Sequence, residues 1–186
     1  MHDNLGSIPG ADPFDPAVLD VPFEDIPFAI TTNPRVTFTP DPSLNLTTHL
    51  QEHVINGQTK VGSNGQPTAT GAHFANSPNV EVDFSRAVYD PSGNGVFVAP
   101  VKVRTATGGL APKGNSPLGP ELSTFFPITW SEKRVLAEIE IAAKSVPTAP
   151  PGTTVAIKVV NPSGVTILVR KNDKGVVVQT YPVKGN

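Results

Sequence analysis

The fold class is decided by the stretch from Thr129 to Val183, TWSEKRVLAEIEIAAKSVPTAPPGTTVAIKVVNPSGVTILVRKNDKGVVVQTYPV. Its first part predicts a helix, because Thr129 and Glu132 have the spacing of a capping box and apolar residues then recur on one helical face. That apolar face consists of Val135, Leu136, Ile139, Ala142, Ala143 and Val146. Prolines at positions 147, 150 and 151 end the helix, since proline lacks the amide hydrogen that a helix needs.

Three strand-like runs follow this helix, at residues 155–160, 165–170 and 176–183. The connecting sequences, NPSG at 161–164 and KNDKG at 171–175, are rich in residues that favour tight turns. Tight turns between successive strands join antiparallel neighbours. We therefore predict a three-stranded antiparallel meander with the long amphipathic helix packed on it.

The N-terminal segment, residues 1–42, is predicted to be an extended arm. It contains eight prolines, which rule out a long helix there. Residues 1–35 hold six acidic residues and one basic residue, a net charge of −5, whereas the remaining chain has thirteen basic and ten acidic residues, a net charge of +3. Part of the arm is expected to lie across the body through its apolar residues, which are Leu19, Val21, Phe23, Ile26 and Phe28.

Residues 43–186 are predicted to form one domain with a mixed α/β (α+β) fold. A helix is expected to begin at Ser43, as its N-cap, and to end before Asn56, because Leu46, Leu50 and Val54 recur every four residues. Antiparallel strands are expected at 80–84 and 96–103, and loops at 57–79 and 105–122.

The composition excludes several classes of site. The 186 residues include no cysteine, which excludes disulfides, zinc–thiolate sites, iron–sulfur clusters and cysteine nucleophiles. No apolar run is long enough to span a membrane, so no membrane partner is expected. The weakly basic body is compatible with a polyanionic ligand.

The sequence His49-Leu50-Gln51-Glu52-His53 matches the H-x-x-E-H pattern of one class of zinc peptidase. Two histidines one helical turn apart would bind the metal, and Glu52 would act as general base. A third ligand would come from Glu138 or Glu140. This pattern provides one hypothesis for the function.

A second hypothesis needs no metal. Cleavage of RNA by its own 2′-hydroxyl requires a base, an acid and a cation that stabilises the phosphorane. Two histidines suit the first two roles because their pKa lies near neutrality, and a lysine suits the third. His73 and Lys113 lie in glycine-rich segments of the kind that line clefts.

Four blocks of the sequence closely resemble the bacterial EndoU ribonuclease domain, over roughly residues 43–186. The blocks occur in the order found in that family: HVING at 53–57, TGAH at 70–73, STFFPITWS at 123–131 and QTYP at 179–182. The family groups with barnase-like and colicin-type ribonucleases, and the resemblance implies an α/β fold with a β-sheet cleft. It implies a uridine-preferring endoribonuclease that acts on single-stranded RNA and leaves a 2′,3′-cyclic phosphate.

The resemblance also assigns roles to individual residues. His53 and His73 match the two catalytic histidines. The sequence does not determine which is base and which is acid; we take His73 as the base and His53 as the acid. Lys113 matches the catalytic lysine, and Lys102 is the alternative. Thr180 and Tyr181 match the region that contacts the base, where a hydroxyl or backbone amide reads uracil and a ring stacks on it. His49 falls outside the family blocks.

The resemblance further implies that no cofactor is needed and that no divalent metal is required, while stimulation by Mn²⁺ stays open. Bacterial EndoU domains often form the C-terminal end of secreted polymorphic toxins that an immunity protein neutralises. By this resemblance an immunity or inhibitor protein is a plausible partner, and the site of action is expected to be cytoplasmic, with the protein either delivered into a target cell or free-standing. We also expect a monomer. A non-catalytic RNA-binding module is the third hypothesis.

Overall fold

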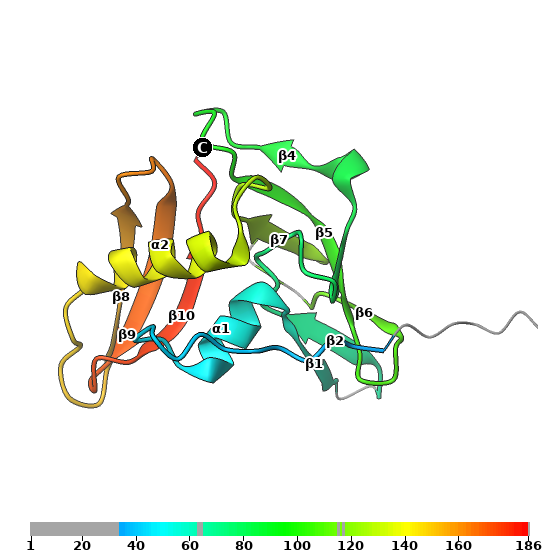
Figure 1. Ribbon diagram of the computed structural model, residues 1–186, viewed down its shortest axis with the longest axis horizontal. Helices are drawn as coiled ribbons and strands as arrows, with labels where there is room; N and C mark the ends of the chain where they lie inside the picture. Colours follow the sequence, from blue (N-terminus) through cyan, green and yellow to red (C-terminus); the bar gives the residue numbers. More distant parts are fainter. Residues whose placement is uncertain (1–33, 63–64, 115, 117, 186) are drawn as a thin grey trace, which may run out of the picture. The chain divides into compact units, whose positions relative to one another are not determined.

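The structure, a computed structural model, describes residues 34–62, 65–114, 116 and 118–185 (Figure 1). The apolar arm residues that were expected to lie across the body, between Leu19 and Phe28, are outside the described residues. Residues 34–42 were also assigned to the arm, and they contact the domain: Arg35 donates to the carbonyl of Arg104, and Val36 is bonded through its main chain to the side chain of Asn79.

Two α-helices are present, α1 (Thr48–Ile55) and α2 (Glu132–Lys144). Both begin later than predicted. Thr47, rather than Ser43, caps α1, because the Asp41 carboxylate accepts hydrogen bonds from both the amide and the hydroxyl of Ser43 and holds it in a turn. Ser131, rather than Thr129, caps α2. Neither described helix is long and apolar enough to cross a membrane.

The C-terminal half confirms the predicted meander. Strands β8 (Thr154–Val160), β9 (Thr166–Asn172) and β10 (Val177–Pro182) pair antiparallel in the order β10-β9-β8. Helix α2 runs along one face of this sheet (Figure 1). The main core lies between them and is filled by the predicted apolar face of α2 together with inward residues of the strands, among them Val135, Ile139, Val146, Ile167 and Val169.

A second sheet is built around β5 (Phe97–Arg104), which pairs antiparallel with each of its four neighbours. These neighbours are β3 (Val80–Val82), β4 (Val88–Tyr89), β6 (Leu110–Pro112) and β7 (Leu122–Phe125). A 3₁₀ helix, η2 (Phe84–Arg86), separates β3 from β4. The sheet has its own small core, in which the buried rings of Phe97 and Phe125 stack with centroids 5.0 Å apart.

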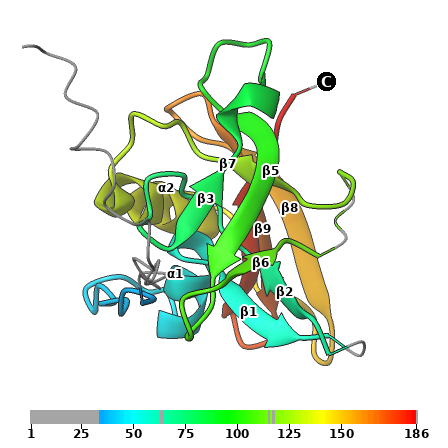
Figure 2. The same cartoon turned by 90° about the vertical axis from the view of Figure 1, so that its right-hand side faces the viewer.

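A two-stranded hairpin completes the fold: β1 (Gln58–Val61) pairs antiparallel with β2 (Pro67–Thr70). It lies next to β6 (Figure 2), and a bridge joins Ala69 to Lys113. The prediction of loops over 57–79 and 105–122 was therefore wrong at β1, β2 and β6, and at Leu122, the first residue of β7. These strands are short and polar or half-exposed, so they lack the apolar alternation by which a strand is recognised.

Candidate active site

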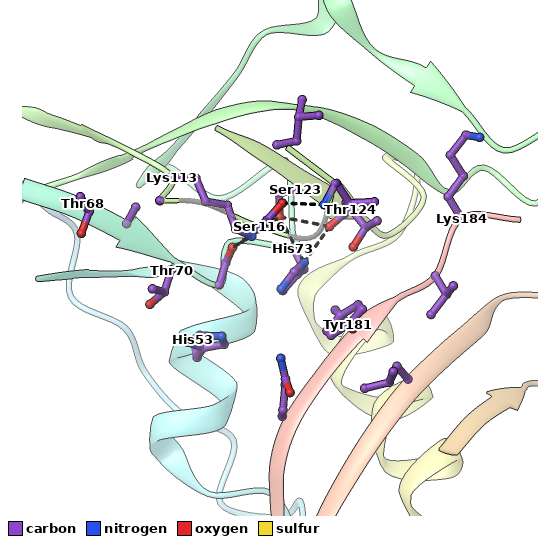
Figure 3. A pocket seen from close by; sticks show the side chains of 18 of the residues that line it. His53, Thr68, Thr70, His73, Lys113, Ser116, Ser123, Thr124, Tyr181 and Lys184 are labelled. Atoms are coloured by element: carbon purple, nitrogen blue, oxygen red, sulfur yellow. Dashed lines mark hydrogen bonds between the residues drawn. The ribbon is translucent and has the colours of Figure 1, made fainter. Parts of the chain in front are cut away.

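A cavity of about 590 Å³ opens between the hairpin, β7 and the meander. Figure 3 shows His53, His73 and Tyr181 facing one another within it, with Lys113 and Lys184 on either side. The cavity brings together four of the five predicted site residues, His53, His73, Lys113 and Tyr181. They come from α1, the segment after β2, the end of β6 and β10.

The two histidines meet because the chain after β2 packs directly on the end of α1. The amide of Ala72 donates to the carbonyl of His53 at 2.9 Å, and the amide of His73 donates to that of Val54 at 2.7 Å. Gly71 makes this approach possible: its φ is +70°, and a Cβ there would lie 2.0 Å from the His53 carbonyl oxygen. The ring centroids of His53 and His73 are consequently 6.4 Å apart.

His73 is buried, with 6% of its surface exposed. Its Nδ1 lies 2.7 Å from the carbonyl oxygen of Thr124. A carbonyl can only accept, so Nδ1 carries the proton and Nε2 of the neutral ring is left as the basic nitrogen. Burial, and then the positive charge of Lys113, hold the pKa of His73 well below 6.5.

His53 is oriented in the same sense by a different partner. Its Nδ1 lies 3.2 Å from the amide oxygen Oε1 of Gln58, so Nδ1 again carries the proton and Nε2 is left free. The amide nitrogen of Gln58 lies 3.0 Å from Nδ1 of His49, which makes Gln58 a bridge between the two histidines of α1. Burial lowers the pKa of His53, while the Gln58 hydrogen bond opposes that shift.

Lys113 points its ammonium group toward the same place. Its Nζ donates to the carbonyl oxygen of Gly71 at 2.8 Å and to Oγ of Ser123 at 2.6 Å. The third N–H of the ammonium group is then left for a ligand. Burial lowers the pKa of Lys113 to about 8, so the group is mostly cationic at neutral pH.

Ser123 is almost fully buried and touches both groups. Besides accepting from Lys113, its Oγ donates to the carbonyl of Ala72 at 3.0 Å and lies 3.3 Å from Nδ1 of His73. The hydroxyl therefore connects the lysine to the buried histidine.

Tyr181 and Thr180 lie on opposite faces of β10. The Tyr181 ring stacks on His73, with centroids 5.7 Å apart and planes inclined by 24°. Thr180 is opposite Val169, whose side chain belongs to the core, and its own side chain is fully buried with no hydrogen-bond partner for Oγ1 among the described residues. The hydroxyl of Thr180 does not line the cavity.

The main chain of Thr180 has a different orientation. Val183 donates its amide to the carbonyl of Thr166 on β9. Because alternate residues of an antiparallel strand bond to the same neighbour, the amide of Tyr181 turns toward β9 and that of Thr180 toward the outer edge of β10. That edge contacts α1 and β7.

The lining of the cavity is strongly biased in charge. Four lysines line it and no aspartate or glutamate does, among the residues that the structure describes. The lysines are Lys60, Lys113, Lys158 and Lys184. The main chain next to Lys184 is anchored, since the amide of Gly185 donates to the Asp90 carboxylate. The cavity is therefore suited to a polyanion.

The alternative lysine, Lys102, lies elsewhere. It lines a separate, smaller pocket on β3 and β5 together with Glu81, Asp83 and Glu121. Lys113, and not Lys102, is the lysine placed beside the two histidines.

The H-x-x-E-H pattern does not assemble into a metal site. Gln58 binds Nδ1 of both histidines, and Glu52 forms an ion pair with Arg35 at 3.4 Å. Glu138 is bound by Asn161 and Ser163, and Glu140 accepts from the amide of Asn45 and forms an ion pair with Lys144. Across residues 34–62, 65–114 and the described part of 116–185, no group of three or more His, Asp or Glu side chains is placed to hold a metal ion.

Sequence reasoning missed Ser123, Gln58 and three of the four lysines. Ser123 lies in the STFFP block, but its contact with Lys113 becomes visible only when β6 and β7 are placed side by side on β5. Gln58 follows the HVING block directly, and nothing in its identity marks it as a histidine partner. In the sequence, nothing distinguishes the other three lysines from ordinary surface lysines; they are Lys60, Lys158 and Lys184.

Comparison with known protein families matches the part of the chain that forms this cavity. The family model described as bacterial EndoU nuclease matches residues 47–184. A search of curated proteins and a search of solved structures found no match.

Proposed function

The chain belongs to the bacterial EndoU nuclease family, and from that premise we propose that it is a metal-independent endoribonuclease that cuts single-stranded RNA, preferentially at uridine, through attack of the 2′-hydroxyl. One observation carries this proposal. Two histidines present their Nε2 atoms to a cavity that holds a lysine ammonium group and no described carboxylate. A phosphodiester is the ligand for which such a set is chemically suited.

In the proposed reaction, Nε2 of neutral His73 takes the proton of the 2′-hydroxyl. The 2′-oxygen then attacks phosphorus, and the bond from phosphorus to the 5′-oxygen breaks. The leaving oxygen takes a proton from Nε2 of His53, which closes the proton balance. The products are a 2′,3′-cyclic phosphate and a 5′-hydroxyl. Lys113 stabilises the negative charge that develops on the phosphorane oxygens.

The environments of the two histidines support this division of roles. A base must be neutral before the reaction, and deep burial beside Lys113 keeps His73 neutral. The acid must be protonated, and His53 is less buried and its charged form is stabilised by Gln58. A phosphate in the cavity would raise the pKa of His53 further, because an anion stabilises the imidazolium.

The nucleobase of the substrate, uracil, is proposed to bind at β10. Tyr181 supplies an aromatic surface for stacking, and the main-chain amide of Thr180, rather than its buried hydroxyl, is the group oriented to read an edge of uracil. Replacing Tyr181 by alanine should lower the ratio of cleavage at uridine to cleavage at adenosine in dinucleotides. An unchanged ratio would exclude this binding site for the nucleobase.

The proposal is tested by incubating a uridine-containing RNA with the protein in EDTA. We expect cleavage by the wild type and by His49→Ala, and loss of cleavage in His53→Ala and His73→Ala. Cleavage that survives in either of those two variants would refute the mechanism. Cleavage that requires added metal would refute metal independence, and binding without product would favour the non-catalytic RNA-binding module.

The biological setting is a further part of the proposal. We propose a monomeric catalytic domain over residues 43–186 behind the arm at 1–42, which acts as a toxin in the cytoplasm and is neutralised by an immunity protein. Growth arrest on expression in a bacterial host, relieved by His73→Ala, would support a toxic ribonuclease. Normal growth with active enzyme present would contradict it.

A further inference from the structure

A row of side chains crosses the meander, starting beside the histidine pair. Tyr181 on β10 is paired with Leu168 on β9, and Leu168 is paired with Lys158 on β8. Residues directly opposite one another in antiparallel strands project on the same face of a sheet. All three line the cavity, so the row runs across the cavity face of the meander.

A second row lies next to the first and adds another cation. Gln179 on β10 is paired with Arg170 on β9, and Arg170 is paired with Ala156 on β8. Since side chains two residues apart along a strand share a face, Arg170 projects on the same side as Leu168. Lys158 and Arg170 are thus diagonal neighbours on adjacent strands.

This face carries no negative charge within the three strands. Its residues on β8 and β9 are Thr154, Ala156, Lys158, Val160, Thr166, Leu168, Arg170 and Asn172, and its residues on β10 are Gln179 and Tyr181. Helix α2 packs on the opposite face, so this face is not covered by α2.

Lys158 and Arg170 are exposed, and among the described residues neither side chain has an ion pair or a hydrogen bond. Basic residues elsewhere in the same part of the fold do have partners. Lys171 donates to the carbonyl of Val146, and Lys144 is paired with Glu140 on α2. The two cations on the cavity side are therefore available for an external anion.

We propose that Lys158 and Arg170 form an outer phosphate-binding site that holds the RNA backbone beyond the nucleotide being cut. The inference rests on the proposed ribonuclease function. Lys158 is two strands away from Tyr181, about 10 Å at the usual strand spacing. An RNA strand that leaves the nucleobase site along this row would bring its backbone phosphates to the ammonium group of Lys158 and to the guanidinium group of Arg170. A guanidinium group binds phosphate through two parallel hydrogen bonds.

The test compares a short and a long substrate with one cut site each. The short one is a uridine-containing dinucleotide, and the long one is a 12-residue DNA oligomer with a single ribouridine at its centre. The measured quantity is the ratio of kcat/KM for the 12-mer to kcat/KM for the dinucleotide. The variants are Lys158→Ala, Arg170→Ala and the double variant, with Lys174→Ala as the control. Lys174 is an exposed lysine in the turn between β9 and β10 and does not line the cavity.

We expect the double variant to lower this ratio by about three- to tenfold and to make the fall of log(kcat/KM) with log salt concentration for the 12-mer shallower by about 0.7 for each cation removed. Lys174→Ala should keep both the ratio and the salt slope of the wild type. Lys158→Gln with Arg170→Gln, checked by thermal unfolding, serves as a second double variant that retains side-chain bulk.

The outcomes separate the two proposals. A wild type that cleaves neither substrate would refute the proposed function itself. A wild type that cleaves both, with a ratio that is the same in the double variants, would overturn the outer site and leave the ribonuclease proposal intact. An equal decrease in Lys174→Ala would also overturn it, because the effect would then come from net charge alone.

Discussion

Oγ of Ser123 lies 2.6 Å from Nζ of Lys113, in a buried position that also places it 3.3 Å from Nδ1 of His73. A single hydroxyl thus fixes the distance between the proposed cation and the proposed base. The carbonyl of Gly71 is the second acceptor for the same ammonium group. Lys113 is held from two sides, which leaves its third hydrogen for the phosphorane.

Replacing Ser123 by alanine should lower kcat by about tenfold or more, because a hydrogen bond to a charged group contributes about 1.5–3 kcal/mol. The ammonium group also loses an acceptor that stabilises its charged form, so the pKa of Lys113 should fall below its value of about 8. The measurement is the pH dependence of kcat/KM, in which the loss of activity assigned to Lys113 should move to lower pH. Ser145→Ala, at the exposed C-cap of α2, is the control. A lower kcat with that limb in its original place would mean that Ser123 has only a packing role.

The pH profile of the wild type follows from the three shifted groups. His73 must be neutral, so kcat/KM should fall as pH drops through its pKa, which lies well below 6.5. His53 must be protonated, so kcat/KM should also fall as pH rises through its pKa, which is lowered from 6.5. The maximum of kcat/KM should therefore lie below pH 6.5, with a further loss above pH 8 as Lys113 loses its proton. A maximum above pH 6.5 would contradict the assigned protonation states.

Gln58 should influence the proposed acid, His53, through its amide oxygen. Its amide oxygen stabilises the protonated ring, so Gln58→Ala should lower the pKa of His53 and move the descending limb of kcat/KM to lower pH. NMR titration of His53 gives that pKa directly. His49→Ala leaves the Gln58 oxygen in place and is the matched control. If both variants shift the pKa of His53 equally, that pKa depends on the whole His49–Gln58–His53 chain of contacts and not on the Gln58–His53 hydrogen bond alone.

Gly71→Ala should both destabilise the protein and abolish activity. The added methyl group would lie 2.0 Å from the His53 carbonyl oxygen, which is far too close, so α1 and the segment carrying His73 must separate. We expect a loss of about 2–4 kcal/mol in the free energy of unfolding, measured by denaturant titration. Gly152→Ala has a similar φ of +72° but nothing within 4 Å, and should lose much less. Equal losses would show that φ, and not the close approach, is what Gly71 is required for.

The sequence was most informative where the pattern had a clear period. The apolar face of α2 and the turns of the meander identify that half of the fold, because burial against one partner imposes a helical or an alternating repeat. Strands β1 and β2 have no such repeat, since the hairpin is polar and half-exposed. The cap of α1 differs for a local reason: the Asp41 carboxylate binds Ser43, and the helix begins one turn later.

The sequence predicted several residues that line the cavity, but it did not predict the contacts that hold them in place. His53 and His73 lie in the family blocks, whereas Lys113 was predicted from the loop before STFFP, with Lys102 as the alternative. The alternation of β10 places the Tyr181 ring in the cavity and the Thr180 hydroxyl in the core, which adjacent positions in a motif do not reveal. Ser123 and Gln58 were not predictable, because hydrogen bonds between different elements leave no periodic signal.

The central claim is that the 2′-hydroxyl is the nucleophile and that His73 and His53 exchange its proton. Mass spectrometry of the products from a DNA oligomer with one ribouridine, cleaved in EDTA, tests this most directly. The account predicts a 5′ fragment that ends in a 2′,3′-cyclic phosphate, a 3′ fragment with a 5′-hydroxyl, and no cleavage when the ribouridine is replaced by 2′-deoxyuridine. A fragment with a 5′-phosphate, or cleavage of the all-deoxy oligomer, would contradict it.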